Sequence, residues 1–343
     1  MSHANNSEYL ETLKKINHRH MLSSLSTNSE LIEAIKTHSL SADQLHLLTA
    51  DTQTAGRGQR GRSWQSPAGN VYLSLYYPMT VPISGLLSLI IGVELAKMPI
   101  IQAFNKQLIA QGLTPIGVKW ANDLGFYNTL AISDRPVATD ANKGTDKPKN
   151  SAEQIIYFNK LAGILIEPVW QAGKLVGIVI GVGLNVKATP KLTTQTLEGM
   201  SYQALSLQDI KQTLAIKAPT DKQMTLADSL LNLTELYVQI SQALIEALKG
   251  FESIAKEQLA EQMSTMQTST QQTSASESFI KEFDQLDALA GLRIQVSQNH
   301  SDNVQIITGF ADGIDTNGCL QLRQDNGKLA TLFTGRIDVI ENY

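Results

Sequence analysis

The chain has 343 residues, 42% of them hydrophobic, and a formal net charge of −4 at pH 7. The length suits two domains or one large domain with an appendage, and the hydrophobic content is enough for a sizeable core. The sequence pI near 5.9 excludes a global electrostatic attraction to nucleic acid or to an anionic membrane, so any basic site has to be local.

Redox and targeting features indicate the cytoplasm. A single cysteine, Cys319, excludes an internal disulfide and a cysteine-based zinc site, and it fits a reducing compartment. The first residues lack the basic start and apolar core of a signal peptide. The longest apolar stretch, near residues 86–93, is too short to cross a bilayer. We therefore expect a soluble cytoplasmic protein without a membrane partner.

The first part of the chain predicts a helix, two strands and a long apolar helix, at residues 27–35, 45–48, 71–77 and 84–111. Pro99 lies inside the long helical pattern and should break or kink it, because proline removes a backbone hydrogen bond and clashes with the preceding turn.

Further along, residues 161–169 and 174–184 are apolar at nearly every position, which indicates two strands buried on both faces and joined as a hairpin. Thr225 to Asp228 resembles a capping box that opens a leucine-rich helix, with Gly250 as its stop. From Gly291 onward, short strands with Asn-Gly turns predict a compact β module.

Two polar stretches are predicted to be disordered, at residues 134–154 and 264–278. Their composition cannot bury enough apolar surface to offset the conformational entropy that ordering would cost.

The segment from Gly56 to Trp64 holds three glycines and three arginines, and we call it the glycine–arginine loop. Such a loop brings backbone N–H groups and fixed positive charge to a phosphate or carboxylate, although an exposed basic loop would have the same composition. Its spacing also matches the dinucleotide-binding fingerprint, which needs a following helix and an acidic residue about 20 positions on. Pro67 and Gly69 oppose that helix, and residues 62–92 contain no acidic residue. The segment therefore fails both requirements of the dinucleotide-binding fingerprint.

Three further clusters combine charge with apolar strands. Residues 118–124 place Lys119, Asn122 and Asp123 at a strand end, where Asp123 suits Mg²⁺ or where both residues merely cap a turn. Lys160 leads the apolar strand 161–169, so its ammonium needs an anionic partner at the rim of the core, or it snorkels to water. The glycines at 181 and 183, followed by Asn185, permit the close approach of a ligand or of another backbone.

In this order along the chain, the four clusters resemble the signatures of bacterial biotin–protein ligases. The matching segments are the glycine–arginine loop ending in Trp64, then Lys-Trp-x-Asn-Asp-Leu, Lys-Leu-Ala-Gly-Ile-Leu-Ile-Glu and Gly-x-Gly-Leu-Asn. Each motif alone is weak, whereas four in register are highly specific. The resemblance covers roughly residues 22–343.

The resemblance implies an ATP-dependent reaction in two steps. Biotin attacks the α-phosphorus of ATP, which gives biotinyl-5′-AMP and pyrophosphate. The ε-amine of a lysine on a biotin carrier protein, such as that of acetyl-CoA carboxylase, then takes the biotinyl group and releases AMP. Arginine, lysine and Mg²⁺ would supply positioning and charge neutralisation for the first step.

The same match implies a role for each cluster residue. Biotin contacts fall to Ser26, Thr27, Gln53, Arg57, Gly58, Lys160, Gly163 and Gly183. Contacts to ATP or the adenylate fall to Arg60, Arg62, Trp64, Lys119, Asn122 and Asn185, with Trp64 covering the adenine. Catalysis is implied for Lys160, Asp123 and Arg57. Asp123 is also the candidate magnesium ligand.

The sequence departs from the family pattern at several positions. Gln59 stands where several relatives carry another arginine, Ala121 replaces the usual proline, and Leu25 replaces a common aspartate. Residues 124–159 form a much longer segment than relatives often have there, and we assign it no chemical role.

The fold implied is α+β: a mixed β-sheet with flanking helices, like that of class II synthetases, followed by a small SH3-like β-barrel. We expect a ligase domain over residues 1–285, with polar insertions at about 131–154 and 260–278, and the barrel over 286–343. The expected state is a monomer or a homodimer.

Two alternative functions are a lipoate–protein ligase and a biotin-sensing DNA-binding repressor. The first uses a related fold and the same adenylation, but the arginine-rich loop belongs to the biotin branch. Against the second, only 25 residues precede Ser26, which leaves no room for a winged helix-turn-helix, so we expect no nucleic acid partner.

Overall fold

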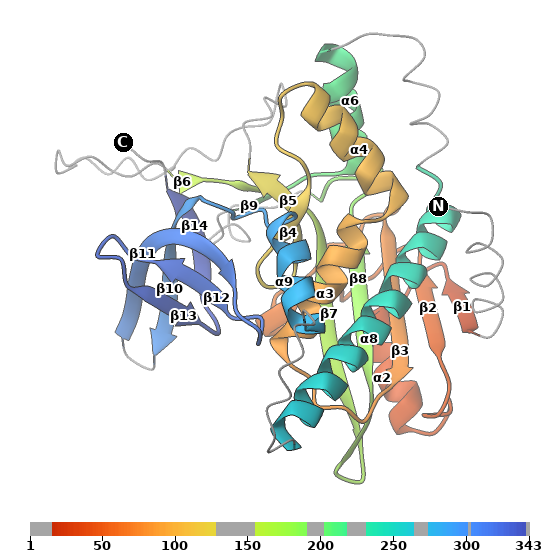
Figure 1. Ribbon diagram of the computed structural model, residues 1–343. Helices are drawn as coiled ribbons and strands as arrows, with labels where there is room; N and C mark the ends of the chain where they lie inside the picture. The colour runs from red at the N-terminus through yellow and green to blue at the C-terminus, as the bar shows by residue number, and fades with distance from the viewer. Residues whose placement is uncertain are drawn as a thin grey trace.

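The computed structural model describes residues 16–127, 155–190, 202–217, 231–263, 274–300 and 303–340. A large mixed sheet with helices packed on it carries most of the chain, and a second sheet at the C-terminal end lies beside it (Figure 1). The expected α+β class, with flanking helices on a mixed sheet, is confirmed.

Within the described residues the large sheet contains eight strands, and seven of them follow one another across it. Their order is β1 (Asn17–Met21), β2 (His46–Ala50), β3 (Val71–Pro78), β8 (Lys174–Leu184), β7 (Phe158–Gln171), β5 (Asp123–Tyr127) and β4 (Gly117–Lys119), and β9 (Tyr202–Ala204) pairs with β7. The pairs β1–β2 and β7–β9 are parallel, and the other neighbours are antiparallel.

Helices cover both faces of this sheet because its strands are apolar on both sides. The helices are α2 (Thr27–Lys36), α3 (Gly85–Ala96), α4 (Pro99–Ala110), α6 (Leu207–Lys217), α8 (Leu233–Met263) and α9 (Ala275–Asp284). On one face, α2 packs on Leu48, Tyr76 and Val179. The strand neighbours of these residues belong to the main core, which α3 and α8 share (Figure 1).

Local sequence explains how the elements nearest the pocket begin and end. Ser26 caps α2 by accepting a hydrogen bond from the backbone N–H of Ser29. Pro99 is the first residue of α4 and ends the run of α3, as predicted.

Among the described residues no single helix is long and apolar enough to span a membrane; only α3 and α4 taken together, bent by 70°, have the length and composition.

The predicted hairpin is confirmed as β7 and β8, which form the centre of the sheet. Its turn places Ala172 and Gly173 at positive φ angles of 47° and 76°, the geometry that two-residue hairpin turns favour. The pairing of the hairpin extends from this turn to Ala162 and Leu184 at its other end, and Lys160 lies on β7 just beyond it.

In the part of the chain that the structure describes, the C-terminal sheet has six strands, in the order β13 (Leu329–Leu332), β12 (Leu320–Arg323), β11 (Asn303–Ile314), β10 (Arg293–His300), β14 (Arg336–Ile340) and β6 (Ile155–Ile156). It is antiparallel, which is consistent with the predicted β module. Gly318 and Gly327 have positive φ angles of 78° and 80° in its two Asn-Gly turns. The domain boundary at 285/286 stays a proposal, and β6 crosses it from the middle of the chain.

Backbone and side-chain hydrogen bonds join the two sheets. Val118 in β4 donates to Leu286 at 2.7 Å and accepts from Ala288 at 2.9 Å. The indole N–H of Trp120 donates to the carbonyl of Gly318 at 2.9 Å. The C-terminal sheet therefore contacts the strand end that carries the Lys-Trp-x-Asn-Asp motif.

Two sequence predictions are wrong. Gly250 does not end its helix, because α8 continues to Met263 and packs Leu248 and Phe251 into the core on either side of it. Residues 274–278 are not disordered, because Ser274 caps α9 through the backbone N–H of Glu277. The polar insertion expected at about 260–278 stays a prediction, and its first residues are helical in α8. The predictions for residues 131–154, 225–230 and 264–273 lie outside the described residues.

Candidate active site

A single pocket of about 240 Å³ gathers almost every predicted site residue. The glycine–arginine loop, the start of α2, the β7–β8 hairpin, the turn after β4 and the loop before β14 surround it. The predicted residues that line it are Ser26, Thr27, Gln53, Arg57, Gly58, Arg60, Arg62, Trp64, Lys119, Asn122, Asp123, Lys160, Gly163 and Gly183. Asn185 is the exception, because it is buried just beyond β8 and does not line the pocket.

One end of the pocket is polar and held rigidly. The Gln53 side-chain oxygen accepts from the backbone N–H of Thr27 at 2.9 Å and from its hydroxyl at 3.2 Å. The Gln53 amide nitrogen donates to the Ser66 hydroxyl at 3.0 Å. Because both ends of the amide are fixed, this floor presents donors and acceptors in a defined pattern, as recognition of a polar ring requires.

The middle of the pocket has a wall of two glycines covered by Trp64. A Cβ atom on Gly163 would lie 3.0 Å from the indole ring, and one on Gly183 would lie 2.6 Å from it. Only glycine therefore allows the ring to lie this close to the hairpin. The buried Trp64 Nε1 has no hydrogen-bond partner within the described part of the chain.

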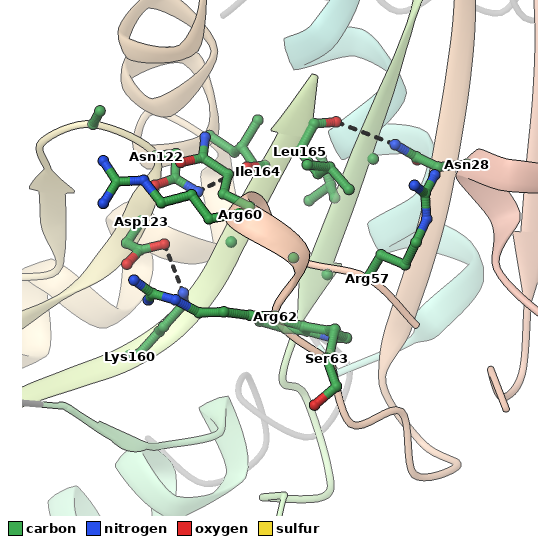
Figure 2. A pocket seen from close by; sticks show the side chains of 18 of the residues that line it. Asn28, Arg57, Arg60, Arg62, Ser63, Asn122, Asp123, Lys160, Ile164 and Leu165 are labelled. Carbon is green, nitrogen blue, oxygen red and sulfur yellow. Dashed lines mark hydrogen bonds and ion pairs between the residues drawn. The ribbon is translucent and has the colours of Figure 1, made fainter. Parts of the chain in front are cut away.

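The other end of the pocket is cationic. Lys160 Nζ lies 2.7 Å from Asp123 Oδ1, and both side chains are mostly buried. The Lys160 ammonium also lies 5.4 Å from the Trp64 ring centroid and 5.0 Å from that of Tyr202. The partner that the sequence pattern requires for Lys160 is thus a carboxylate in this structure, beside a space that an anionic ligand could enter (Figure 2).

Lys119 lies deeper at the same end, with its ammonium 4.9 Å from the Phe158 ring centroid. Burial lowers the pKa of Lys119 to about 8, and the positive charges of Lys160 and Arg62 oppose its protonation too. The carboxylates of Asp123 and Asp338 act in the opposite direction. An anionic ligand beside Lys119 would therefore stabilise its charged form.

The two polar residues that follow β4, Asn122 and Asp123, make different contacts. The Asn122 amide nitrogen donates to the Ile164 carbonyl, and its own backbone carbonyl accepts from the Ile164 N–H, each at 2.9 Å. Asn122 therefore caps the β7 backbone, as a turn residue would. Asp123 instead pairs with Lys160. The peptide bond between Trp120 and Ala121 is cis.

The glycine–arginine loop crosses the pocket without forming the helix that dinucleotide binding requires. It contains a single 3₁₀ turn, Gln59–Gly61, and the chain continues to β3. Arg57 bonds Glu167 at 2.7 Å and Arg60 bonds the Thr334 hydroxyl. Figure 2 shows Arg57 beside Asn28 on one side of the pocket, and Arg62 extending toward Asp123 and Lys160 on the other.

Sequence reasoning missed three parts of the pocket lining and one residue that bonds to it. Asn28 lines the pocket. Glu167 does not line it but bonds Asn28 and Arg57, which do. Asn28 and Glu167 lie inside the quoted motifs or next to them, but their partners come from distant segments, so no local pattern revealed a role. Tyr202 and the loop 333–337 belong to elements that carry no motif. Only the fold brings the C-terminal sheet to the mouth of the pocket.

Comparisons with known proteins agree with this architecture. Residues 24–185 match the model of the biotin/lipoate A/B protein ligase family. The bifunctional ligase/repressors BirA of Salmonella typhimurium and Escherichia coli are 35% and 34% identical over 140 residues, which is 40% of this chain and 32% of each relative. The chain therefore matches about a third of the length of these relatives.

A solved structure extends the likeness to nearly the whole chain at the level of the fold. The biotin protein ligase from Aquifex aeolicus in complex with biotin and ATP has a TM-score of 0.54 and 17% identity, covering 95% of this chain and 99% of that one. A mutant of the same ligase in complex with biotin gives the same TM-score with 18% identity, over the same shares of the two chains. Residues 24–185 are thus similar to the biotin/lipoate A/B protein ligase family, and the chain has the fold of the Aquifex aeolicus biotin protein ligase.

Proposed function

We propose that the protein is an ATP-dependent biotin–protein ligase. It would activate biotin as biotinyl-5′-AMP and transfer the biotinyl group to a lysine of a biotin carrier protein, such as that of acetyl-CoA carboxylase. The observation that carries the proposal is the order of surfaces in one pocket: a fixed polar floor at Gln53, a glycine wall, and buried ammonium groups at Lys119 and Lys160. A polar ring on an apolar chain that ends in a carboxylate fits this order.

In the first step, a biotin carboxylate oxygen attacks the α-phosphorus of ATP, and pyrophosphate leaves. We assign Lys160 to bridge the carboxylate and the α-phosphate, since its ammonium lies between the glycine wall and the cationic end. Lys119 and Arg62 would offset the negative charge that gathers on the phosphate oxygens. Lys160 has to exchange Asp123 for the substrate as its partner.

In the second step, the amine of the carrier lysine attacks the acyl carbon of the mixed anhydride, and AMP leaves. The proton that the amine loses as the amide forms goes to solvent water. Arg60 and Trp64, which lie on the loop above the pocket, are assigned to hold the adenylate until the carrier arrives. Asn185 does not line the pocket, so its assignment to the nucleotide requires a ligand to reach past the end of β8.

Magnesium is assigned to Asp123. The described residues contain no group of three or more histidine, cysteine or acidic side chains that could hold a metal. One carboxylate suits an ion held mainly by substrate phosphates and water, which is how Mg²⁺ usually binds with nucleotides. When bound, the ion would supply charge neutralisation at the phosphates.

A lipoate ligase remains the second candidate, because the matching family includes both ligases. We favour biotin because the glycine–arginine loop lies over the pocket and the polar floor suits a ring with amide-like groups. Isothermal titration with biotin, lipoate and ATP separates the two. We also propose that the protein acts in the cytoplasm, that it does not bind DNA, and that it is a monomer or a homodimer.

The decisive test is biotin-dependent exchange between ATP and pyrophosphate. Lys160→Ala should reduce exchange about 10²-fold or more, because it removes the cation at the reacting groups. Lys174→Ala is the matched control, since Lys174 lies at the exposed turn of the same hairpin, opposite the pocket. Near-normal exchange in a folded Lys160→Ala protein would contradict the assignment.

A further inference from the structure

Glu167 on β7 does not itself line the pocket, but it binds two segments that do. Its Oε2 atom accepts from Arg57 Nη2 at 2.7 Å and from Asn28 Nδ2 at 2.9 Å. Arg57 belongs to the glycine–arginine loop, and Asn28 belongs to the first turn of α2. One carboxylate oxygen therefore ties the loop to the pocket wall.

Asn28 continues this contact into the polar floor. Its Nδ2 atom also donates to the Leu165 carbonyl at 3.3 Å (Figure 2), which fixes the orientation of the amide. The Ser74 hydroxyl contacts Asn28 Oδ1 at 2.5 Å and Thr27 Oγ1 at 2.7 Å. Thr27 in turn contacts Gln53. An unbroken chain of hydrogen bonds thus runs from Arg57 to the floor of the pocket.

The middle of this series of hydrogen bonds is buried. Asn28 and Ser74 are buried, so their polar groups have to find partners inside the protein. Gly181 on β8 leaves the space that Asn28 fills, because a Cβ atom there would overlap the Asn28 amide. Two neighbouring strands thus accommodate the Asn28 amide: Gly181 on β8 leaves space for it, and Glu167 on β7 accepts its hydrogen bond.

We propose that Glu167 is a positioning residue for biotin binding: it holds Arg57 over the polar end of the pocket and fixes the floor through Asn28. This inference rests on the proposed function. Among the described residues, Glu167 is the acidic partner of Arg57. Without it, the arginine loses the charged bond that keeps its guanidinium at the pocket, while Lys160 and Asp123 at the other end remain paired.

The test separates binding from chemistry with Glu167→Gln, which keeps the shape and an acceptor for Asn28 but removes the charge. The expected result is a rise of about tenfold in KM for biotin in ATP–pyrophosphate exchange, because a charge-assisted hydrogen bond is lost. The expected kcat stays within about twofold of wild type, because the reacting end is untouched. Gly181→Ala should raise the same KM by displacing Asn28.

The matched control is Glu94→Gln. Glu94 has the same side-chain exposure of 22% and pairs with Lys97 at 2.6 Å on α3, outside the pocket. It should leave KM unchanged, and its Tm should match that of Glu167→Gln. In a double-mutant cycle, Glu167→Gln should add little to the KM defect of Arg57→Gln, because the two residues act as a pair.

Three results would decide against the inference. An unchanged KM in Glu167→Gln would overturn it, as would an additive effect of the two substitutions. A drop in Tm below that of the control, together with a loss of kcat, would show a structural role instead. Absence of biotin-dependent exchange in the wild-type protein would overturn the proposed function itself, and the inference with it.

Discussion

Lys119 is a buried cation whose charge depends on pH near neutrality. Burial lowers its pKa to about 8, so the free protein loses this charge as pH rises through 8. If the charge holds the phosphates, kcat/KM for ATP should fall about tenfold per pH unit above 8, since this parameter reports the free enzyme. Lys119→Arg should keep a flatter profile up to about pH 9.5, because a guanidinium stays protonated there.

The measurement is ATP–pyrophosphate exchange between about pH 6.5 and 9.5 for both proteins. Each profile is compared with its own value near neutral pH, because the arginine will also change the absolute rate. The same decline in Lys119→Arg would show that another group titrates.

At the level of single residues, the sequence was most informative where a charge interrupts an apolar strand. Lys160 needed an anionic partner, and Asp123 supplies it. It was uninformative where the partner comes from far along the chain. Glu167 and Arg57 are 110 positions apart, and nothing in either local pattern indicates the other. Asn185, by contrast, holds a motif position but does not line the pocket, and its assignment to the nucleotide stays a prediction.

The glycine–arginine loop is the element whose order should depend on ligand. Its three arginines repel one another, and its contacts to the rest of the protein include the bonds to Glu167 and Thr334. Biotin and ATP bring the negative charge that offsets this repulsion. Trypsin should therefore cut after Arg57, Arg60 or Arg62 in the free protein, and biotin plus ATP should suppress these cuts.

Mass spectrometry of the fragments over time is the measurement. Cleavage after Lys328, which is exposed in the β12–β13 turn far along the C-terminal sheet, is the internal control and should not change. Equal rates of cutting in the loop with and without ligands would contradict the prediction.

Whole elements followed from the sequence when two signals agreed, or when one signal was as strong as a proline inside a helical pattern. The β7–β8 hairpin had two apolar runs and a turn between them, and the break between α3 and α4 had a proline. Gly250 was a single signal, and a glycine inside a helix costs only about 1 kcal/mol relative to alanine. Burial of Leu248 and Phe251 beside it outweighs that cost. The start of α9 was missed because its serine-rich composition resembles a disordered segment.

At the scale of the whole molecule, Asp287 lies at the junction of the two sheets, next to Val118. Burial raises its pKa from 3.8 to about 7. The folded protein therefore binds more protons than the unfolded chain between about pH 4 and 7, and the free energy of unfolding falls as pH rises through that window. Asp287→Asn removes the charge and keeps an acceptor for the Leu289 N–H, which Asp287 now binds at 2.9 Å.

The expected result is a Tm gain for Asp287→Asn of roughly a few degrees at about pH 8 and little gain at about pH 5. Thermal unfolding followed by circular dichroism at the two pH values measures it. Asp325→Asn is the contrast, because Asp325 is exposed and Arg293 lowers its pKa. That substitution should raise Tm at neither pH. Equal gains for Asp287→Asn at both pH values would contradict the assigned ionisation.

The bond between the Trp120 indole and the Gly318 carbonyl, with the pairing of β6 and β14, has a consequence for dissecting this protein. A fragment ending at residue 285 would leave the indole N–H without its acceptor and would uncover the start of α3, on which Gly318 rests. Removing the C-terminal sheet should therefore destabilise the rest of the chain. If the two fragments are expressed together, they should reassemble through the Trp120–Gly318 bond and the pairing of β6 with β14.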